Sequence, residues 1–190
     1  VRRPVRVVKG RHVAGLEAGA RRCEVEVAAG GVGLMVVSDG GSGMSESDAR
    51  LCVQRHATSK IASFAELGHM RTFGFRGEAL PSIASVSRFE LTTRSRDDDA
   101  GIELAIEGGA EPVIRPTGAP VGTRVTIRDL FYNVPARRKF LRSTGTESGH
   151  VPDVGEAAAP AAPDLTFNLT RDGRTGRDGH HHRTPHRGRA

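Results

Sequence analysis

Two short blocks of the sequence contain residues suited to binding phosphate. GFRGEAL (Gly74–Leu80) has an aromatic and a basic residue between two glycines, so its backbone can approach an anion closely. A helix is expected over 77–84, and its N-terminus would offer N–H groups and the positive end of a dipole. RHATSKI (Arg55–Ile61) adds the charge of Lys60 to that of Arg76. The two blocks predict a phosphate-binding loop, and the absence of G-x-x-x-x-G-K-[ST] excludes a P-loop.

Several elements are expected around these blocks. Alternating apolar residues predict a strand at Arg22–Ala28. A second strand is expected at Gly33–Ser38 after a turn at Ala29–Gly31, so the two would form a hairpin. DGGSG at Asp39–Gly43 is then a loop, and Ser45 is the N-cap of a helix that runs to about Arg55. Further strands are expected at Arg88–Arg94, Gly101–Glu107, Pro112–Arg115 and Thr123–Arg128, and further helices at Val5–Ala20, Phe64–Met70, Gly77–Ala84 and Pro135–Arg142. These elements predict an α+β fold, a mixed sheet covered on one face by helices.

The composition limits the class of protein. The chain has 190 residues, 37% of them hydrophobic and 4% aromatic, which suffices for one domain with a modest core. Lysine and arginine number 28 against 22 acidic residues, and the net charge of +6 fits either a nucleic-acid partner or a general richness in arginine. Cys23 and Cys52 lack metal-ligand spacing and indicate reduced thiols. No signal peptide and no apolar run long enough to span a membrane is found.

RHATSKI, GFRGEAL and DLFYNVPARRKFL (Asp129–Leu141) occur together, and this combination resembles the N-terminal ATPase domain of the MutL family of DNA mismatch repair proteins. That family belongs to the GHKL superfamily, with gyrase-type topoisomerases, Hsp90 chaperones and sensor histidine kinases. The resemblance runs from about Pro4 to about Arg142 and returns at Asp164–Arg174. It implies a GHKL-type (Bergerat) α+β sandwich, with a mixed, mostly antiparallel sheet and helices on one face. A histidine kinase or topoisomerase subunit is disfavoured, because neither is expected to carry all three blocks.

The resemblance also implies a nucleotide site. Asp39 would accept a hydrogen bond from the adenine amino group, and Gly41 and Gly43 would let the base and the sugar approach the backbone. A carboxylate suits this role because it only accepts hydrogen bonds, so it favours an amino group over a carbonyl. Thr123, after Gly122, would help to hold adenine through its hydroxyl group, although DGGSG and Gly-Thr alone would each be interpreted as ordinary turns. The lid over the triphosphate would contribute Thr58, Ser59, Lys60, Gly74, Phe75, Arg76 and Gly77.

The first motif departs from the family pattern. Family members carry a helix resembling KELVENSLDAGA, where this chain has KGRHVAGLEAGA at Lys9–Ala20. Gly10 replaces the glutamate that acts as general base, and Ala14 replaces the asparagine that binds Mg²⁺. Neither residue offers the side-chain oxygen that these tasks need, and a missing general base typically slows a reaction by a factor of about 10²–10⁴. Nucleotide binding is therefore expected to survive in weakened form, with hydrolysis very slow or absent.

The sequence divides into four parts by composition and resemblance. These are an N-terminally incomplete GHKL-type ATP-binding domain at 1–142, a Pro/Ala-rich linker-like segment at 143–163, a remnant strand and turn at 164–174, and a disordered, basic, His-rich tail at 175–190. Within LFYNVPARRKFL, the apolar residues are expected in the core and Arg137–Lys139 on a solvated helix face. Contact of that face with DNA or phosphate is the second interpretation.

The resemblance implies a function in DNA mismatch repair: ATP binding, ATP-dependent dimerisation of the N-terminal domain, and contact with DNA and a MutS-type mismatch-recognition protein. The cofactors would be ATP and Mg²⁺, with no intact Mg²⁺ ligand at Ala14. The expected location is the cytoplasm, with the nucleoid if the source is bacterial, and no membrane partner is expected. The alternative is a non-catalytic nucleotide- or DNA-binding module or a decaying gene product, favoured by Gly10, Ala14 and the Pro/Ala run at Val151–Pro163.

Overall fold

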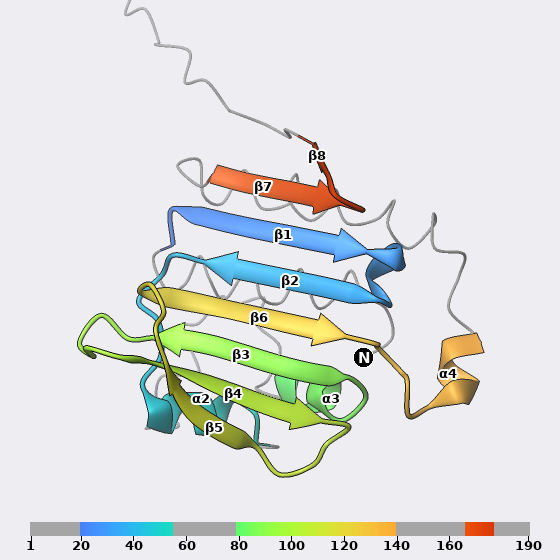
Figure 1. The fold of residues 1–190 in the computed structure, drawn as a ribbon, viewed down its shortest axis with the longest axis horizontal. Coiled ribbons are helices and arrows are strands. Elements are labelled where there is room, and N and C mark those ends of the chain that lie inside the picture. Colours follow the sequence, from blue (N-terminus) through green and yellow to red (C-terminus); the bar gives the residue numbers. More distant parts are fainter. Residues whose placement is uncertain (1–19, 55–78, 140–165, 177–190) are drawn as a thin grey trace, which may run out of the picture.

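One mixed sheet dominates the computed structural model, which describes residues 20–54, 79–139 and 166–176 (Figure 1). The strands of these residues lie in the order β5-β4-β3-β6-β2-β1-β7-β8. They are β1 Arg22–Ala28, β2 Leu34–Asp39, β3 Arg88–Arg94, β4 Gly101–Glu107, β5 Val113–Thr117, β6 Gly122–Arg128, β7 Thr166–Arg171 and β8 Arg174–Gly176. The helical segments are the 3-10 turn η1 Ala29–Gly31 and the α-helices α2 Glu46–Cys52, α3 Ala79–Ala84 and α4 Pro135–Lys139.

Neighbouring strands of the sheet are antiparallel in every pair except one. β1 and β2 form the expected hairpin through η1, and β6 pairs with both β2 and β3. The exception is β7, the strand expected at 164–174, which runs parallel to β1. Parallel neighbours need a long connection, and the chain between β1 and β7 contains five other strands of the sheet, β2 to β6. The mixed, mostly antiparallel sheet expected from the sequence is thus confirmed.

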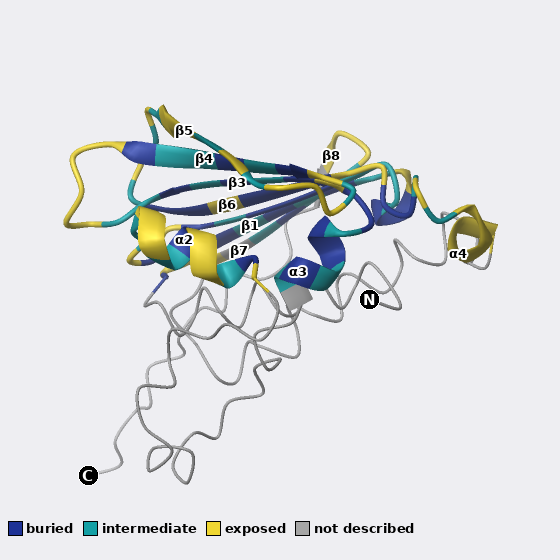
Figure 2. Ribbon diagram, turned by 90° about the horizontal axis from the view of Figure 1, so that it is seen from below, coloured by how far each residue is buried: buried dark blue, intermediate teal, exposed yellow. Residues whose placement is uncertain are grey.

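Helices cover one face of this sheet. Figure 2 shows α2 and α3 on the same side, beneath the strands in that view. The helix α4 lies apart from this layer, beyond the end of β6, and contains no buried residue. None of the helices in the described segments combines the length and the apolar character that crossing a membrane would require.

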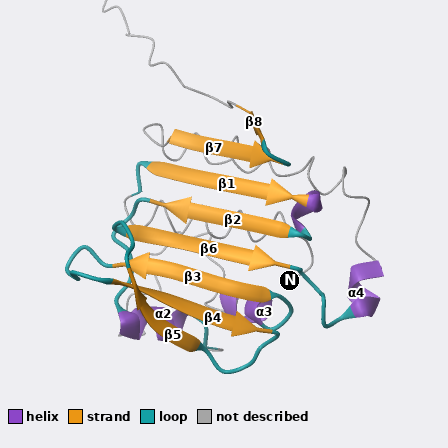
Figure 3. Cartoon of the chain, viewed as in Figure 1, coloured by secondary structure: helices purple, strands orange, loops and turns teal. Residues whose placement is uncertain are grey.

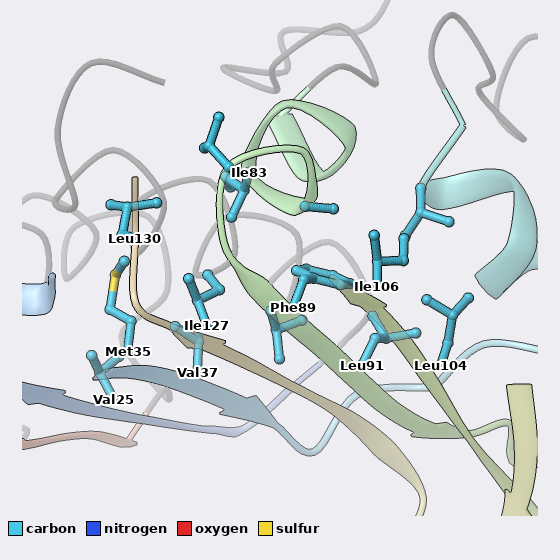
Figure 4. Close-up of a cluster of buried hydrophobic side chains, with 14 of the residues drawn as sticks. Val25, Met35, Val37, Ile83, Phe89, Leu91, Leu104, Ile106, Ile127 and Leu130 are labelled. Carbon is cyan, nitrogen blue, oxygen red and sulfur yellow. The ribbon is translucent and has the colours of Figure 1, made fainter. Parts of the chain in front are cut away.

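The core lies between the sheet and the two covering helices. Burial alternates along β1 and β3, as expected for strands with one face packed and one face polar. Figure 4 shows side chains from β1, β2, β3, β4 and β6 on the same side of the sheet as Ile83 of α3 and Leu130, which follows β6. The largest fully buried side chains are Phe89, Phe131, Met35, Ile83, Leu91, Leu104, Ile127, Leu130 and Leu169. Aliphatic residues therefore supply most of the packing, in line with the low aromatic content.

Two predicted boundaries are corrected by the structure. The helix after Ser45 ends at Cys52 and not near Arg55, and Val53 occupies its C-cap position. The strand expected at Pro112–Arg115 is β5, Val113–Thr117, and so includes Pro116. Proline is better tolerated on β5 than on a central strand because β5 is an edge strand, with β4 as its one neighbour in the described sheet.

The segment LFYNVPARRKFL divides as expected where the structure describes it. Leu130 and Phe131 are buried, whereas all the residues of α4 with a basic side chain are exposed. Tyr132 lies under the guanidinium group of Arg88, 5.2 Å from ring centroid to Arg88 Cζ. The side-chain amide of Asn133 donates to the carbonyl oxygen of Ser85 over 3.0 Å. The helices expected at Val5–Ala20 and Phe64–Met70 lie outside the described residues.

Candidate functional site

The ends of three adjacent strands meet at one edge of the sheet. β2 and β3 both run antiparallel to β6, so their last residues lie beside the first residues of β6, at the left of the sheet in Figure 3. Asp39, the final residue of β2, is paired with Thr123 of β6, and Thr123 is paired on its other side with Thr93 of β3. The sequence predicted a loop beginning at Asp39, but the structure places this residue in the strand, where the ladder holds its backbone.

Asp39 is a buried carboxylate, with only 8% of the residue exposed. Its position alternates with Met35 and Val37, so its side chain lies on the face of the sheet that the helices cover. Oδ1 of Asp39 accepts a hydrogen bond from the backbone N–H of Gly41 over 3.1 Å. A buried carboxylate needs such donors, and its roughly four lone-pair positions can accept several at once.

Two glycines let the backbone segments of the site come into contact. Gly43 has φ of 72°, and a Cβ atom built there would overlap the carbonyl oxygen of Arg94 at the end of β3. Gly122 has φ of 128°, and its Cβ would overlap the carbonyl oxygen of Asp39. The backbone N–H of Arg96 also donates to the carbonyl oxygen of Ser42 over 3.0 Å. The DGGSG loop is thus pressed against the end of β3 in a way that requires glycine at position 43.

Thr93 joins this site although the sequence did not predict it. Its Oγ1 accepts from the backbone N–H of Met44 over 3.0 Å, donates to the carbonyl oxygen of Gly122 over 2.9 Å, and lies 3.2 Å from Oγ1 of Thr123. Thr93 and Thr123 are 1% and 6% exposed. The sequence did contain a signal for Thr93. Alternate residues of β3 face the core, and Thr93 is a polar residue at such a position, after the apolar residues Phe89 and Leu91.

The helix α2 begins directly after the loop. Ser45 is its N-cap, as the sequence predicted, and Oγ of Ser45 accepts from the backbone N–H of Asp48 over 3.2 Å. Ser45 has an extended backbone with φ of −68° and ψ of 166°, the usual conformation of an N-cap residue. The cap fixes where the loop ends, only two residues beyond Gly43.

The structure brings together four of the residues expected at the nucleotide site: Asp39, Gly41, Gly43 and Thr123. The expected lid residues Thr58, Ser59, Lys60, Gly74, Phe75, Arg76 and Gly77 lie outside the described residues, as do Gly10 and Ala14. Among residues 20–54, 79–139 and 166–176, no group of three or more His, Cys, Asp and Glu could hold a metal ion.

The mixed, mostly antiparallel sheet with helices on one face is the fold of the GHKL class of ATPase domain that the sequence predicts. The MutL ATPase domain of Aquifex aeolicus complexed with ADP is similar, with a TM-score of 0.75 and 34% identity over 92% of this chain and 62% of that one. Another structure of an Aquifex aeolicus MutL ATPase domain has a TM-score of 0.72 and 31% identity, covering 95% of this chain and 62% of the other.

Comparison of sequences leads to the same family. The DNA mismatch repair protein MutL of Opitutus terrae is 51% identical over 174 residues, which are 92% of this chain and 28% of the relative. That of Akkermansia muciniphila is 52% identical over 172 residues, 90% of this chain and 27% of the relative. No model of a protein family matches the chain. The chain belongs to the MutL family, and it spans less than a third of the length of these relatives.

Proposed function

We propose that this chain binds ATP, with the adenine base held at the sheet edge formed by Asp39 and Thr123. The observation that carries the proposal is the buried carboxylate of Asp39, bonded by the N–H group of Gly41 and paired across the ladder with Thr123. Burying a carboxylate is costly unless donors compensate it, and the amino group of adenine is such a donor. A related domain from Aquifex aeolicus is described as complexed with ADP, which supports the proposal.

The groups proposed to hold the phosphates come from the lid blocks RHATSKI and GFRGEAL. Lys60 and Arg76 would supply positive charge there, and the glycines would supply backbone N–H donors. Mg²⁺ bound with the nucleotide would neutralise part of the triphosphate charge. Ala14 offers no oxygen to such an ion, so the donor set of this chain does not fit the family pattern.

We further propose that hydrolysis is impaired. The attacking water must lose a proton, and Gly10 has no side-chain group to accept it at the position where the family has glutamate. This leaves a domain that holds nucleotide and releases it largely unchanged. In that case ATP would act on the chain as a ligand, through the conformation that it stabilises.

The binding proposal is tested by thermal melting of the purified chain with and without Mg²⁺-ATP. A ligand present at about 100 times its Kd, and binding only the folded state, adds roughly 2.7 kcal/mol of stability, which gives a measurable rise in Tm. Asp39→Asn should abolish that rise, because it places an amide N–H₂ group where the base needs an acceptor. Asp98→Asn is the matched control, since Asp98 is exposed in the turn between β3 and β4. An ATP-induced rise that survives Asp39→Asn would refute the assigned site.

The hydrolysis proposal is tested by restoring the missing groups. The double variant Gly10→Glu/Ala14→Asn should turn over ATP at least about 10² times faster than the unaltered chain, the factor typical of a single general base. Gly10→Gln/Ala14→Asn is the control, because glutamine has nearly the same shape but accepts no proton. If the unaltered chain already hydrolyses ATP as fast as the restored variant, the proposal is wrong.

We also propose that the chain acts in DNA mismatch repair as part of the family's cycle, with ATP-dependent self-association and contact with DNA and a MutS-type protein, in the cytoplasm. Support comes from the family membership and from the exposed basic residues Arg137–Lys139 of α4. Phosphate contacts release counterions, so DNA affinity should fall steeply as salt rises. Sedimentation with and without ATP measures association, and a monomer under both conditions would contradict dimerisation by this chain.

A non-catalytic binding module or the product of a decaying gene remains the second candidate. The Pro/Ala run at 151–163 and the residues at positions 10 and 14 favour it. A cooperative melt without any response to ATP would support this candidate and refute nucleotide binding. A DNA-binding assay on the same preparation would then distinguish a DNA-binding module from an inactive product.

A further inference from the structure

The hydroxyl group of Thr93 uses its complete hydrogen-bonding capacity inside the protein. A hydroxyl has one hydrogen and two lone pairs. The backbone N–H of Met44 can only donate, so at 3.0 Å it occupies one lone pair of Thr93 Oγ1. The carbonyl oxygen of Gly122 can only accept, so at 2.9 Å it takes the single hydrogen of Thr93. One lone pair of Thr93 Oγ1 is then left for the contact with Thr123.

This count decides the direction of the bond between the two threonines. Their Oγ1 atoms are 3.2 Å apart, and Thr93 has no second hydrogen to give. The hydroxyl hydrogen of Thr123 must therefore point inward, toward Thr93. Because both residues are buried, water does not compete for these groups. Thr123 consequently has only lone pairs left for a molecule that binds at the sheet edge.

Asp39 and Thr123 then present the same character to a ligand. They are paired across the β2–β6 ladder, and a carboxylate is likewise an acceptor only. We propose that Thr93 is a positioning residue that makes Thr123 a pure hydrogen-bond acceptor and so sets the preference of this edge for a 6-amino purine over a 6-oxo purine. The inference rests on the proposed nucleotide site. A 6-amino group supplies two hydrogens, whereas a 6-oxo group would place a third acceptor against the first two.

The test compares the affinities of ATP and inosine triphosphate, which carries oxygen in place of the amino group, by titration calorimetry. In Thr93→Val the hydroxyl of Thr123 is free to turn its hydrogen toward the ligand. The ratio of the Kd for inosine triphosphate to the Kd for ATP should then fall about tenfold. This corresponds to a change of about 1.4 kcal/mol in the difference between the two binding free energies. Thr93→Ser keeps the hydroxyl and should retain the ratio of the unaltered chain. Thr92→Val, on the opposite face of β3, is the matched control and should also retain it.

A ratio that stays unchanged in Thr93→Val, even with a lower Tm, would show that Thr93 only stabilises the fold and would overturn the inference. If Thr93→Val does not fold, Thr93→Cys replaces it, because a thiol donates and accepts more weakly, and the ratio should fall by a smaller factor. An unaltered chain that binds both nucleotides equally overturns this inference alone. An unaltered chain that binds neither refutes the proposed function, and the inference with it.

Discussion

The loop after β2 fits against β3 only because Gly43 has no side chain. Its φ of 72° lies in the left-handed region, and a Cβ would overlap the carbonyl oxygen of Arg94. Gly40, three residues earlier in the same loop, has no such restriction: among the described residues, no atom lies within 4 Å of a Cβ built there. At the scale of single residues, the site thus depends on the absence of a Cβ atom at Gly43 as much as on polar side chains such as those of Asp39 and Thr93.

Gly43→Ala is expected to lower the free energy of unfolding by roughly 1–3 kcal/mol, the usual cost of a strained backbone conformation, and to weaken ATP binding because the loop must move away from β3. Chemical denaturation and calorimetry measure the two effects. Gly40→Ala is the matched control and should change stability by less than about 0.5 kcal/mol. Equal effects of both variants would mean that the contact with Arg94 does not restrict the loop.

At the scale of elements, the helix α2 fixes the far end of the loop. It has only seven residues, and isolated helices of that length are not stable in water. Its anchors are the N-cap Ser45, the buried side chain of Ala49, and a pair between Arg50 and Glu46 with 2.7 Å between Nη2 and Oε1. That pair is about half exposed, so it contributes little, and the cap matters more.

Ser45→Ala should lower the free energy of unfolding by about 1 kcal/mol, because the N–H group of Asp48 loses its acceptor. Ser45→Asn, a good N-cap residue, should restore most of the loss. Urea denaturation of the three chains measures this. If Ser45→Asn lowers the free energy of unfolding as much as Ser45→Ala does, Ser45 stabilises the protein through a contact other than the helix cap.

At the scale of the whole molecule, the segment 166–176 completes the sheet. β7 lies beside β1 throughout its length, and Leu169, 2% exposed, is paired with Val25. The backbone N–H of Ala29 also donates to Oδ1 of Asp172 over 3.0 Å, across 143 positions of the sequence. Without β7, β1 would be an edge strand with unpaired backbone groups.

Leu169→Ala is therefore expected to cost about 2–5 kcal/mol of stability, the range for removing a buried leucine side chain. Thr166→Ala, at an exposed position of the same strand, is the control and should change stability little. The measurement is equilibrium unfolding of both variants. If the two behave alike, β7 does not contribute to the core of the folded chain.

Sequence alone predicted where most of the described strands lie and where α2 begins, because these signals are local. Alternation along Arg22–Ala28 predicted a half-buried strand, and Ser45 predicted the N-cap of a helix. Tertiary structure decided which strands are neighbours. β6 lies between β2 and β3, and this order brings Thr93 to Thr123 and Asp39. The alternation of buried and exposed side chains along a strand depends on residues that are adjacent in the chain. The order of the strands in the sheet depends on how the apolar faces of all the strands and helices are buried together. Thr93 therefore became visible as a site residue only in the fold.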